Sequence, residues 1–157
     1  MSSQVLRPQL TTRVAWGRFL RAHAALTREL SARLEAEHGL TLTDFEVLLQ
    51  LNHAPEQAMR RVDIARAVLL TASGITRLLD GLERAGWVEK RACSSDARVS
   101  YAALTEDGLA KFRAAEQSHL ADVQELFAAA FTEEEHEQLA ELLGRLPLAE
   151  TSEACDR

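Results

Sequence analysis

Residues 60–105 carry the feature that most constrains the fold: two short helical patterns followed by two strand patterns with a polar loop between them. The apolar residues of the first helical pattern are Val62, Ile64, Ala65 and Val68. Those of the second follow the i, i+3, i+4, i+7 spacing that lines one face of a helix, at Ile75, Leu78, Leu79 and Leu82. This order predicts a helix–turn–helix unit with a hairpin attached.

The second helical pattern has recognisable ends. Thr71 suits an N-cap, because a threonine hydroxyl accepts a backbone N–H from the next turn. The small residues 72–74 leave the positive end of the helix open to a phosphate. Gly86 suits the position that stops the helix. The polar face carries Ser73, Thr76, Arg77 and Asp80. Taken alone, this segment fits an ordinary antiparallel helix pair equally well.

The strand patterns, residues 87–91 and 99–104, flank a loop too long for a two-residue turn. Within the loop, residues 92–98, Arg98 has no apolar surface to cover, and its planar guanidinium suits phosphates or a narrow minor groove. Asp96 is placed to orient Arg98 by a salt bridge, and a turn-forming aspartate is an equally good interpretation. A helix for the major groove beside an arginine for the minor groove is typical of a DNA-binding unit.

Three segments resemble the MarR family of transcriptional regulators. Gly74–Val88 (GITRLLDGLERAGWV) is similar to their recognition helix and its exit. Asp96–Arg98 followed by Leu104–Gly108 resembles their wing-to-helix signature. Leu40–Leu48 (LTLTDFEVL) resembles the start of their second helix. The resemblance spans about residues 10–146. It implies a homodimeric winged helix–turn–helix repressor whose DNA affinity is commonly lowered by a small molecule or by oxidation.

We therefore expect a homodimer that binds double-stranded DNA at a palindromic operator. The residues expected to face base edges or nearby phosphates in the major groove are Ser73, Thr76 and Arg77. Arg98, oriented by Asp96, is expected in the minor groove, and the phosphate backbone is expected to meet Thr71, Arg91 and Arg61. A protein-interaction winged helix that has lost DNA binding is the alternative. Binding to DNA that weakens steeply with salt separates the two.

The remaining segments are predicted to be helical: residues 14–37, 105–131 and 133–146, the last starting from a Thr132–Glu135 capping box. These helices carry more apolar surface than one small lobe can bury. Residues 10–38 and 106–146 are therefore expected to form the dimer. A monomer with a self-contained bundle is the alternative.

Residues 1–157 are expected to be one mainly α-helical domain with a β wing. Its winged helix–turn–helix DNA-binding lobe is placed at residues 40–105, between N- and C-terminal dimerisation helices, with a flexible tail at residues 147–157. The net charge of −6 argues against a DNA-binding protein only if the charge is averaged over the whole chain. Residues 55–105 hold 8 basic and 6 acidic side chains, whereas residues 106–157 hold 4 and 13. The acidity therefore lies outside the predicted DNA lobe.

The sequence contains no motif that is typical of a catalytic site, a metal site or a membrane span. The five histidines are scattered, without an H-x-x-x-H pair on one helical turn. A Gly-rich phosphate loop and a G-x-S-x-G elbow are both missing. Because no run of about 18 apolar residues and no signal-peptide pattern occur, we expect a cytoplasmic regulator without a cofactor.

An effector site is a weaker prediction. In the resembled family, effectors lodge between the first helix and the DNA-binding lobe. Residues near those elements are candidates for a small aromatic or phenolic effector: Trp16, Phe19, His23 and His53. Packing in a dimer core, or a helix cap for His53, explains these residues better one by one. Arg60 and Arg61 suit an acidic effector or a phosphate equally.

Cys93 stands at the base of the predicted wing, where a thiol-based redox switch would shift Arg98. Lys90 and Arg91 nearby favour the thiolate. The family's peroxide sensors, however, carry their reactive cysteine in the first helix, which has none here. A spectator thiol is the favoured interpretation.

Overall fold

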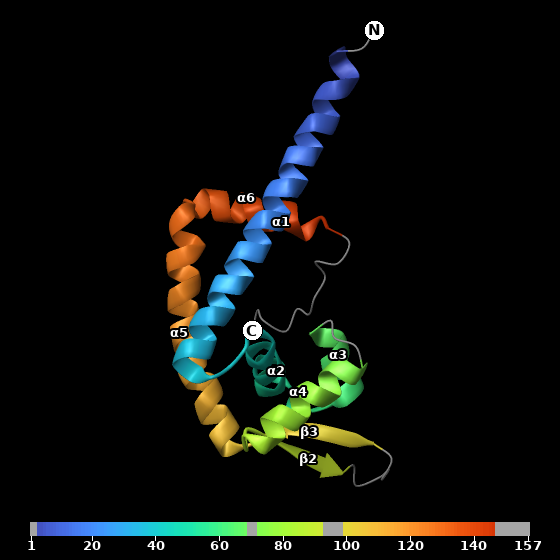
Figure 1. Ribbon diagram of the computed structural model, residues 1–157, viewed down its shortest axis with the longest axis vertical. Coiled ribbons are helices and arrows are strands. Elements are labelled where there is room, and N and C mark those ends of the chain that lie inside the picture. Colours follow the sequence, from blue (N-terminus) through green and yellow to red (C-terminus); the bar gives the residue numbers. More distant parts are fainter. Residues whose placement is uncertain (1–2, 69–71, 93–98, 147–157) are drawn as a thin grey trace.

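The computed structural model describes residues 3–68, 72–92 and 99–146 (Figure 1). These residues form the helices α1 (Ser3–His38), α2 (Leu42–His53), α3 (Arg61–Ala67), α4 (Ala72–Arg84), α5 (Glu106–Leu126) and α6 (Glu133–Gly144). They also form the strands β1 (Ala58–Arg60), β2 (Val88–Ala92) and β3 (Ser100–Leu104), and the 3-10 turns η1 (Pro55–Gln57) and η2 (Ala128–Ala130). The lobe of α2–α4 and the sheet lies at one end, the N-terminal part of α1 extends to the other, and α6 crosses α1 between them in this view (Figure 1).

The sheet is antiparallel with the strand order β1-β3-β2. The β2–β3 hairpin confirms the predicted strand pair, with Val88 opposite Leu104 and Arg91 opposite Tyr101. The sheet also has a strand that the sequence patterns did not indicate, β1, which pairs Arg60 with Tyr101. The arrangement of α3, α4 and this sheet is the predicted winged helix–turn–helix.

The helix ends follow the local signals in the sequence. Gly39 and Gly86 have φ values of 68° and 79°, the left-handed backbone that glycine adopts without a steric cost. The Thr132–Glu135 capping box forms as predicted, and Thr41 and Asp44 form another at the start of α2. Two predicted bounds are wrong. The first helix already begins at Ser3, and the helix from residue 105 ends at Leu126, before η2.

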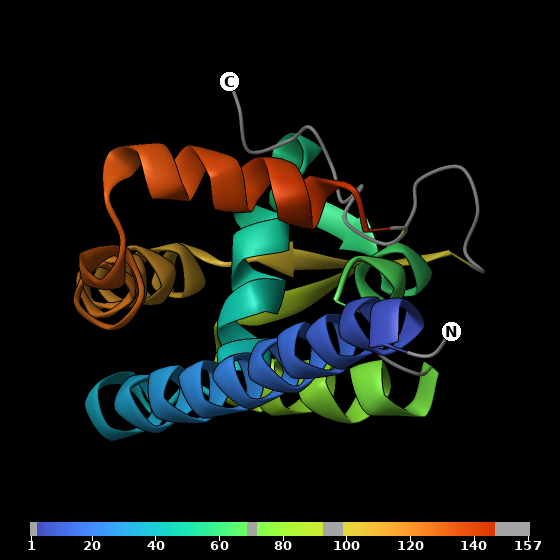
Figure 2. The same cartoon turned by 90° about the horizontal axis from the view of Figure 1, so that it is seen from above.

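The core lies where α5 passes α1 and α2 and where α4 covers the sheet. Its largest fully buried side chains include Phe112 from α5, Leu34 from α1, Leu48 from α2 and Leu79 from α4. The view from above shows α1 and α6 on opposite sides of α2, with α5 seen nearly end-on (Figure 2). In the part of the chain that the structure describes, no helix combines the length and the apolar character needed to cross a membrane.

The base of the hairpin is tied to the start of α5. The Thr105 hydroxyl donates to the Gly86 carbonyl at 2.7 Å and accepts from the backbone N–H of Gly108 at 2.9 Å. The Thr105 N–H also donates to the Trp87 carbonyl, at 3.1 Å. A Cβ built on Gly108 would stand 1.9 Å from that same carbonyl oxygen. Only glycine therefore lets α5 begin this close to the strand.

Candidate nucleic-acid interface

Helix α4 is sharply divided between a buried and an open face. Ile75, Leu79 and Leu82 are buried against the sheet and the neighbouring helices. Three of the predicted major-groove residues lie together on the open face: Ser73, Thr76 and Arg77. Further along the same helix, an open groove of about 770 Å³ is lined by Arg77, Asp80, Glu83 and Arg84. The helix thus presents polar and cationic groups to the outside over most of its length.

Arg61 is the first residue of α3, and its guanidinium is turned toward α4. Its Nη2 lies 3.2 Å from Oε1 of Glu83, and the two side chains are only 24% and 19% exposed. The Nε of Arg61 is buried and has no hydrogen-bond partner among the described residues. Lys90 of β2 reaches the other oxygen of Glu83, with Nζ 3.1 Å from Oε2. One carboxylate therefore joins α3, α4 and β2.

Arg91 lies on the opposite sheet face from Lys90, next to Tyr101. Its Nε is 2.9 Å from Oε1 of Glu89, and its Nη1 donates to the Glu56 carbonyl at 3.5 Å. Arg60 stands on the other side of Tyr101, because β1 and β2 both pair with β3 at that position. The hydrogen bond to Asp63, 2.7 Å long, raises the pKa of Arg60. Two half-exposed guanidinium groups thus flank Tyr101 near the loop end of the β2–β3 hairpin.

Several predicted site residues lie outside the described residues: Thr71, Cys93, Asp96 and Arg98. The Thr71 cap, the wing-tip arginine and the Cys93 thiol therefore stay predictions. Sequence reasoning also overlooked two cations of the same lobe. Arg66 of α3 is strongly exposed, with its Nη1 3.9 Å from Oδ1 of Asp63. Lys90 pairs with Glu83, whereas the sequence pattern places it only beside Cys93. In α3 the buried residues are Ile64 and Ala65, and helical spacing places Arg66 on the opposite, outer side. That spacing is the sequence signal that identifies Arg66 as an exposed cation.

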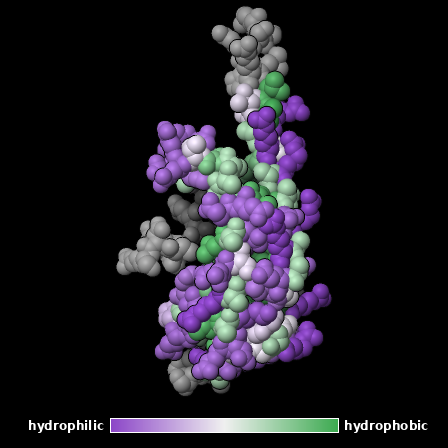
Figure 3. Space-filling model, turned by 90° about the vertical axis from the view of Figure 1, so that its left-hand side faces the viewer, coloured by the Kyte–Doolittle hydropathy of each residue, from purple (hydrophilic) through white to green (hydrophobic). Residues whose placement is uncertain are grey.

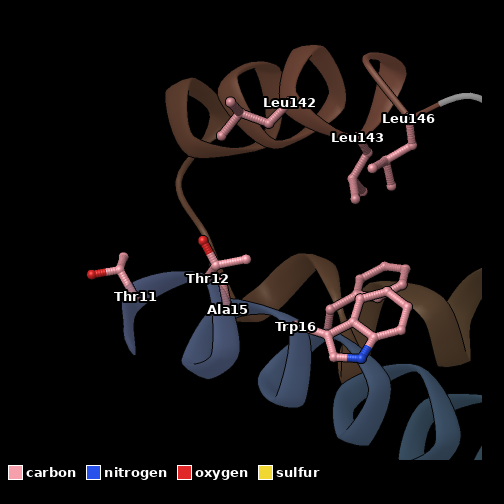
Figure 4. A pocket seen from close by; sticks show the side chains of 8 residues that line it. Thr11, Thr12, Ala15, Trp16, Leu142, Leu143 and Leu146 are labelled. Carbon is pink, nitrogen blue, oxygen red and sulfur yellow. The ribbon is translucent and has the colours of Figure 1, made fainter. Parts of the chain in front are cut away.

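Two of the four effector candidates line a second groove, of about 670 Å³, between α1 and α6. Trp16 and Phe19 line it from α1, and Leu143 of α6 and Leu146, two residues after that helix, point toward Trp16 (Figure 4). The ring centroids of Trp16 and Phe19 lie 6.1 Å apart, and those of Phe19 and His23 lie 6.4 Å apart. His53 is exposed in the last turn of α2 and does not line this groove.

The outer side of α5 has a different character. In the view of this side, hydrophilic residues predominate and smaller hydrophobic areas lie between them (Figure 3). The ion cluster of Arg33 belongs to the α1–α5 contact: Nη1 is 2.8 Å from Asp122, Nη2 is 3.2 Å from Glu125 and Nε is 3.0 Å from Glu29. The hydrogen bonds to these carboxylates, Glu125 first, raise the pKa of Arg33.

His119 of α5 was also missed. Its ring centroid lies 4.7 Å from that of Phe45, and its Nδ1 is buried without a hydrogen-bond partner among the described residues. Desolvation lowers the pKa of His119, and the charge of Asp122 opposes that shift in part. No grouping of three His, Cys, Asp or Glu side chains in the described ranges is suited to a metal ion.

Comparison with known proteins agrees with this geometry. The MarR family model matches residues 38–99, from the last residue of α1 to the residue before β3. The transcriptional regulator MhqR of Bacillus subtilis is 30% identical over 128 residues, which cover 82% of this chain and 86% of MhqR. The chain belongs to the MarR family. Its relatives there are winged-helix transcriptional regulators that bind DNA, not enzymes.

Solved MarR-family structures share the fold over nearly the whole chain. AbsC from Streptomyces coelicolor superimposes with a TM-score of 0.79 at 32% identity, covering 85% of this chain and 89% of AbsC. A cysteine-to-serine mutant of MarR from E. coli, complexed with operator DNA, has a TM-score of 0.73 at 26% identity. That match covers 84% of this chain and 93% of the E. coli protein.

Proposed function

We propose that this MarR-family regulator is a homodimeric repressor that binds a palindromic operator. The observation that carries the proposal is the open face of α4, where Ser73, Thr76 and Arg77 stand together on the side away from the buried Ile75, Leu79 and Leu82. An α-helix with such a face fits the major groove, in which base edges are read. The operator complex of E. coli MarR, a protein of the same fold, supports this role.

The individual contacts are proposed as follows. Arg77 and Thr76 meet base edges or nearby phosphates with Ser73, and Arg98, oriented by Asp96, enters the minor groove. Thr71, Arg91 and Arg61 contact the backbone. Both Arg61 and Arg91 are ion-paired, with Glu83 and Glu89, but Arg61 is 24% exposed and Arg91 47%. The contribution of Arg61 is therefore the smaller.

The dimer is proposed from the apolar surface that one chain leaves uncovered. Trp16 is 60% exposed on α1, Leu120 is 62% exposed on α5 and Leu142 is 55% exposed on α6. Leu20 on α1 and Leu146, just after the end of α6, are exposed as well. Exposed apolar patches of this kind mark interaction sites. A second copy that covers them also places two α4 helices for two half-sites, about 34 Å apart on the duplex.

A small aromatic or phenolic effector is proposed to release the operator. The aromatic side chains Trp16, Phe19 and His23, in one row on α1, support this class of ligand. Titration of the protein–DNA complex with benzoic acids, phenols and oxidants tests the proposal. Dissociation by one of the aromatic classes supports it, and dissociation by oxidants alone favours the alternative of a redox switch at Cys93.

The DNA-binding test uses duplexes selected from a random pool and the region upstream of the gene. Fluorescence anisotropy between about 50 and 200 mM salt is expected to show specific binding that weakens steeply with salt. Arg98→Ala should weaken binding and lower the salt slope by about one unit, because one phosphate-neutralising charge is lost. Arg113→Ala, which removes the same charge from the exposed side of α5, is the control and should bind like the parent.

Arg77→Ala should instead change which bases are tolerated, if this arginine reads guanine edges. A protein that binds no duplex even at the lowest salt would refute the proposed function. That result would favour a winged helix that serves protein interaction.

A further inference from the structure

The geometry points to Glu83 as the residue that sets the position of the wing relative to the recognition helix α4. This inference rests on the proposed function, since it concerns how the lobe meets DNA. Glu83 itself makes no contact with DNA in this proposal. It is a positioning residue that acts through Arg61 and Lys90.

The two cations approach Glu83 from different elements. Arg61 opens α3 and Lys90 lies in β2, two residues before the strand ends at Ala92. Lys90 stands opposite Ala102 in the ladder, on the sheet face that is buried under the helices. Its side chain therefore runs from the strand to α4 and ties the outer half of the hairpin to that helix.

Glu83 is also well placed along α4. It follows Arg77 by six residues, about 9 Å along the helix axis. The helix that carries the major-groove residues is thus fixed to both of its neighbours by a single carboxylate. Because Glu83 and Arg61 are largely shielded from water, this pair is weakened less by salt than an exposed pair would be.

A carboxylate on the DNA side of the lobe has a second possible effect, with the opposite sign. Glu83 lines the groove that also contains Arg77 and Arg84. If its charge only repelled phosphates, removing it would strengthen binding to every DNA sequence alike. If it positions the wing, removing it weakens binding to the operator while binding to unrelated DNA stays equal or improves.

Glu83→Gln keeps the shape of the side chain and removes the charge. Asp80→Asn is the matched control, because Asp80 lies on the same helix, lines the same groove and has no described ion pair with Arg61 or Lys90. Each full-length protein is titrated against a selected operator duplex and against a scrambled duplex of the same composition. Thermal unfolding is recorded to confirm that both variants are folded at the assay temperature.

We expect Glu83→Gln to weaken operator binding about tenfold, within the range over which groups of one ion-pair network couple. Binding to the scrambled duplex should not weaken, so the ratio of the two affinities falls. Asp80→Asn should leave that ratio unchanged. In the free protein, amide hydrogen exchange in β2 and β3 should accelerate in Glu83→Gln and not in Asp80→Asn, while exchange in α2 stays the same.

Three results would overturn the inference. They are an affinity ratio that stays unchanged, as equal strengthening on both duplexes would leave it, a ratio that rises, or a lowered ratio without faster exchange in the strands. Failure of the parent protein to bind any duplex would instead refute the proposed function, and the hydrogen-exchange comparison would still decide whether Glu83 holds the wing.

Discussion

At the scale of single residues, the most tightly fitted position is Gly108. Gly108→Ala should lower the free energy of unfolding by about 1–3 kcal/mol or more, because its Cβ would meet the Trp87 carbonyl oxygen at 1.9 Å and force the backbone apart. Urea denaturation measures the change. Gly81→Ala is the control: nothing lies within 4 Å of its Cβ, so the variant should be more stable by about 0.5–1 kcal/mol. Equal effects at the two positions would contradict the proposed fit.

His119 gives the second residue-scale prediction, on pH. Its pKa in the folded chain lies below the ordinary value of 6.5, so the unfolded chain binds more protons below that pH. The folded state therefore loses stability as the pH falls from about 6.5 toward the lowered pKa. His119→Phe keeps an aromatic ring against Phe45 and removes the titration.

The measurement is the midpoint of thermal unfolding at several pH values. As the pH falls below 6.5, the unfolding midpoint of His119→Phe should rise relative to that of the parent protein. A pH-independent difference for His119→Phe would show that desolvation of this imidazole has no weight in stability.

At the scale of elements, the turn between α2 and β1 is strained. Pro55 and Glu56 are the middle of a turn closed by a 3.0 Å hydrogen bond from the Gln57 N–H to the Ala54 carbonyl. Glu56 occupies the third position of this turn and has a φ of 55°, in the left-handed region. Glycine is the preferred residue at that position of such a turn. Glu56→Gly should stabilise the protein by about 0.5–1 kcal/mol, since the left-handed penalty exceeds the entropy that glycine adds to the unfolded chain.

Chemical denaturation again provides the measurement, and Glu56→Ala is its control. Alanine removes the same charge but keeps the Cβ, so its stability should stay close to that of the parent. Stabilisation by both variants would trace the effect to the charge of Glu56 and not to its backbone.

Elements with local signals were predictable, and those held by distant partners were not. The amphipathic stripe of α4, Gly86 after it and the Thr132–Glu135 capping box each depend on residues a few positions apart. Strand β1 contains a single large apolar side chain, Met59, and exists because it pairs with β3 more than 40 residues later. The pairing of β1 with β3 cannot be predicted from the pattern of residues within a few positions of β1.

The candidate site divides in the same way. The open face of α4 follows from helical spacing alone, so Ser73, Thr76 and Arg77 could be selected from the sequence. The partner of Arg61 is 22 residues away on another helix, and only the fold shows that the two side chains meet. A count of charges treats Arg61 and Arg91 alike, although one is shielded and the other half exposed.

At the scale of the whole molecule, the exposed leucines of α6 predict the assembly. Leu142→Lys should raise the dimer dissociation constant at least about 30-fold, because an unpaired charge buried in an interface costs roughly 2–5 kcal/mol. Sedimentation equilibrium measures it. Glu137→Gln changes the net charge by the same amount at an exposed position on the other side of α6 and should leave the constant unchanged. A parent chain that sediments as a monomer would remove the dimer from the proposal.

The three contacts at the foot of the hairpin, between Thr105, Gly86, Trp87 and Gly108, have a mechanical consequence. They hold the base of the β2–β3 hairpin against the first turn of α5. A displacement of that turn is therefore coupled to a displacement of the hairpin base, and the coupling acts with equal strength in both directions.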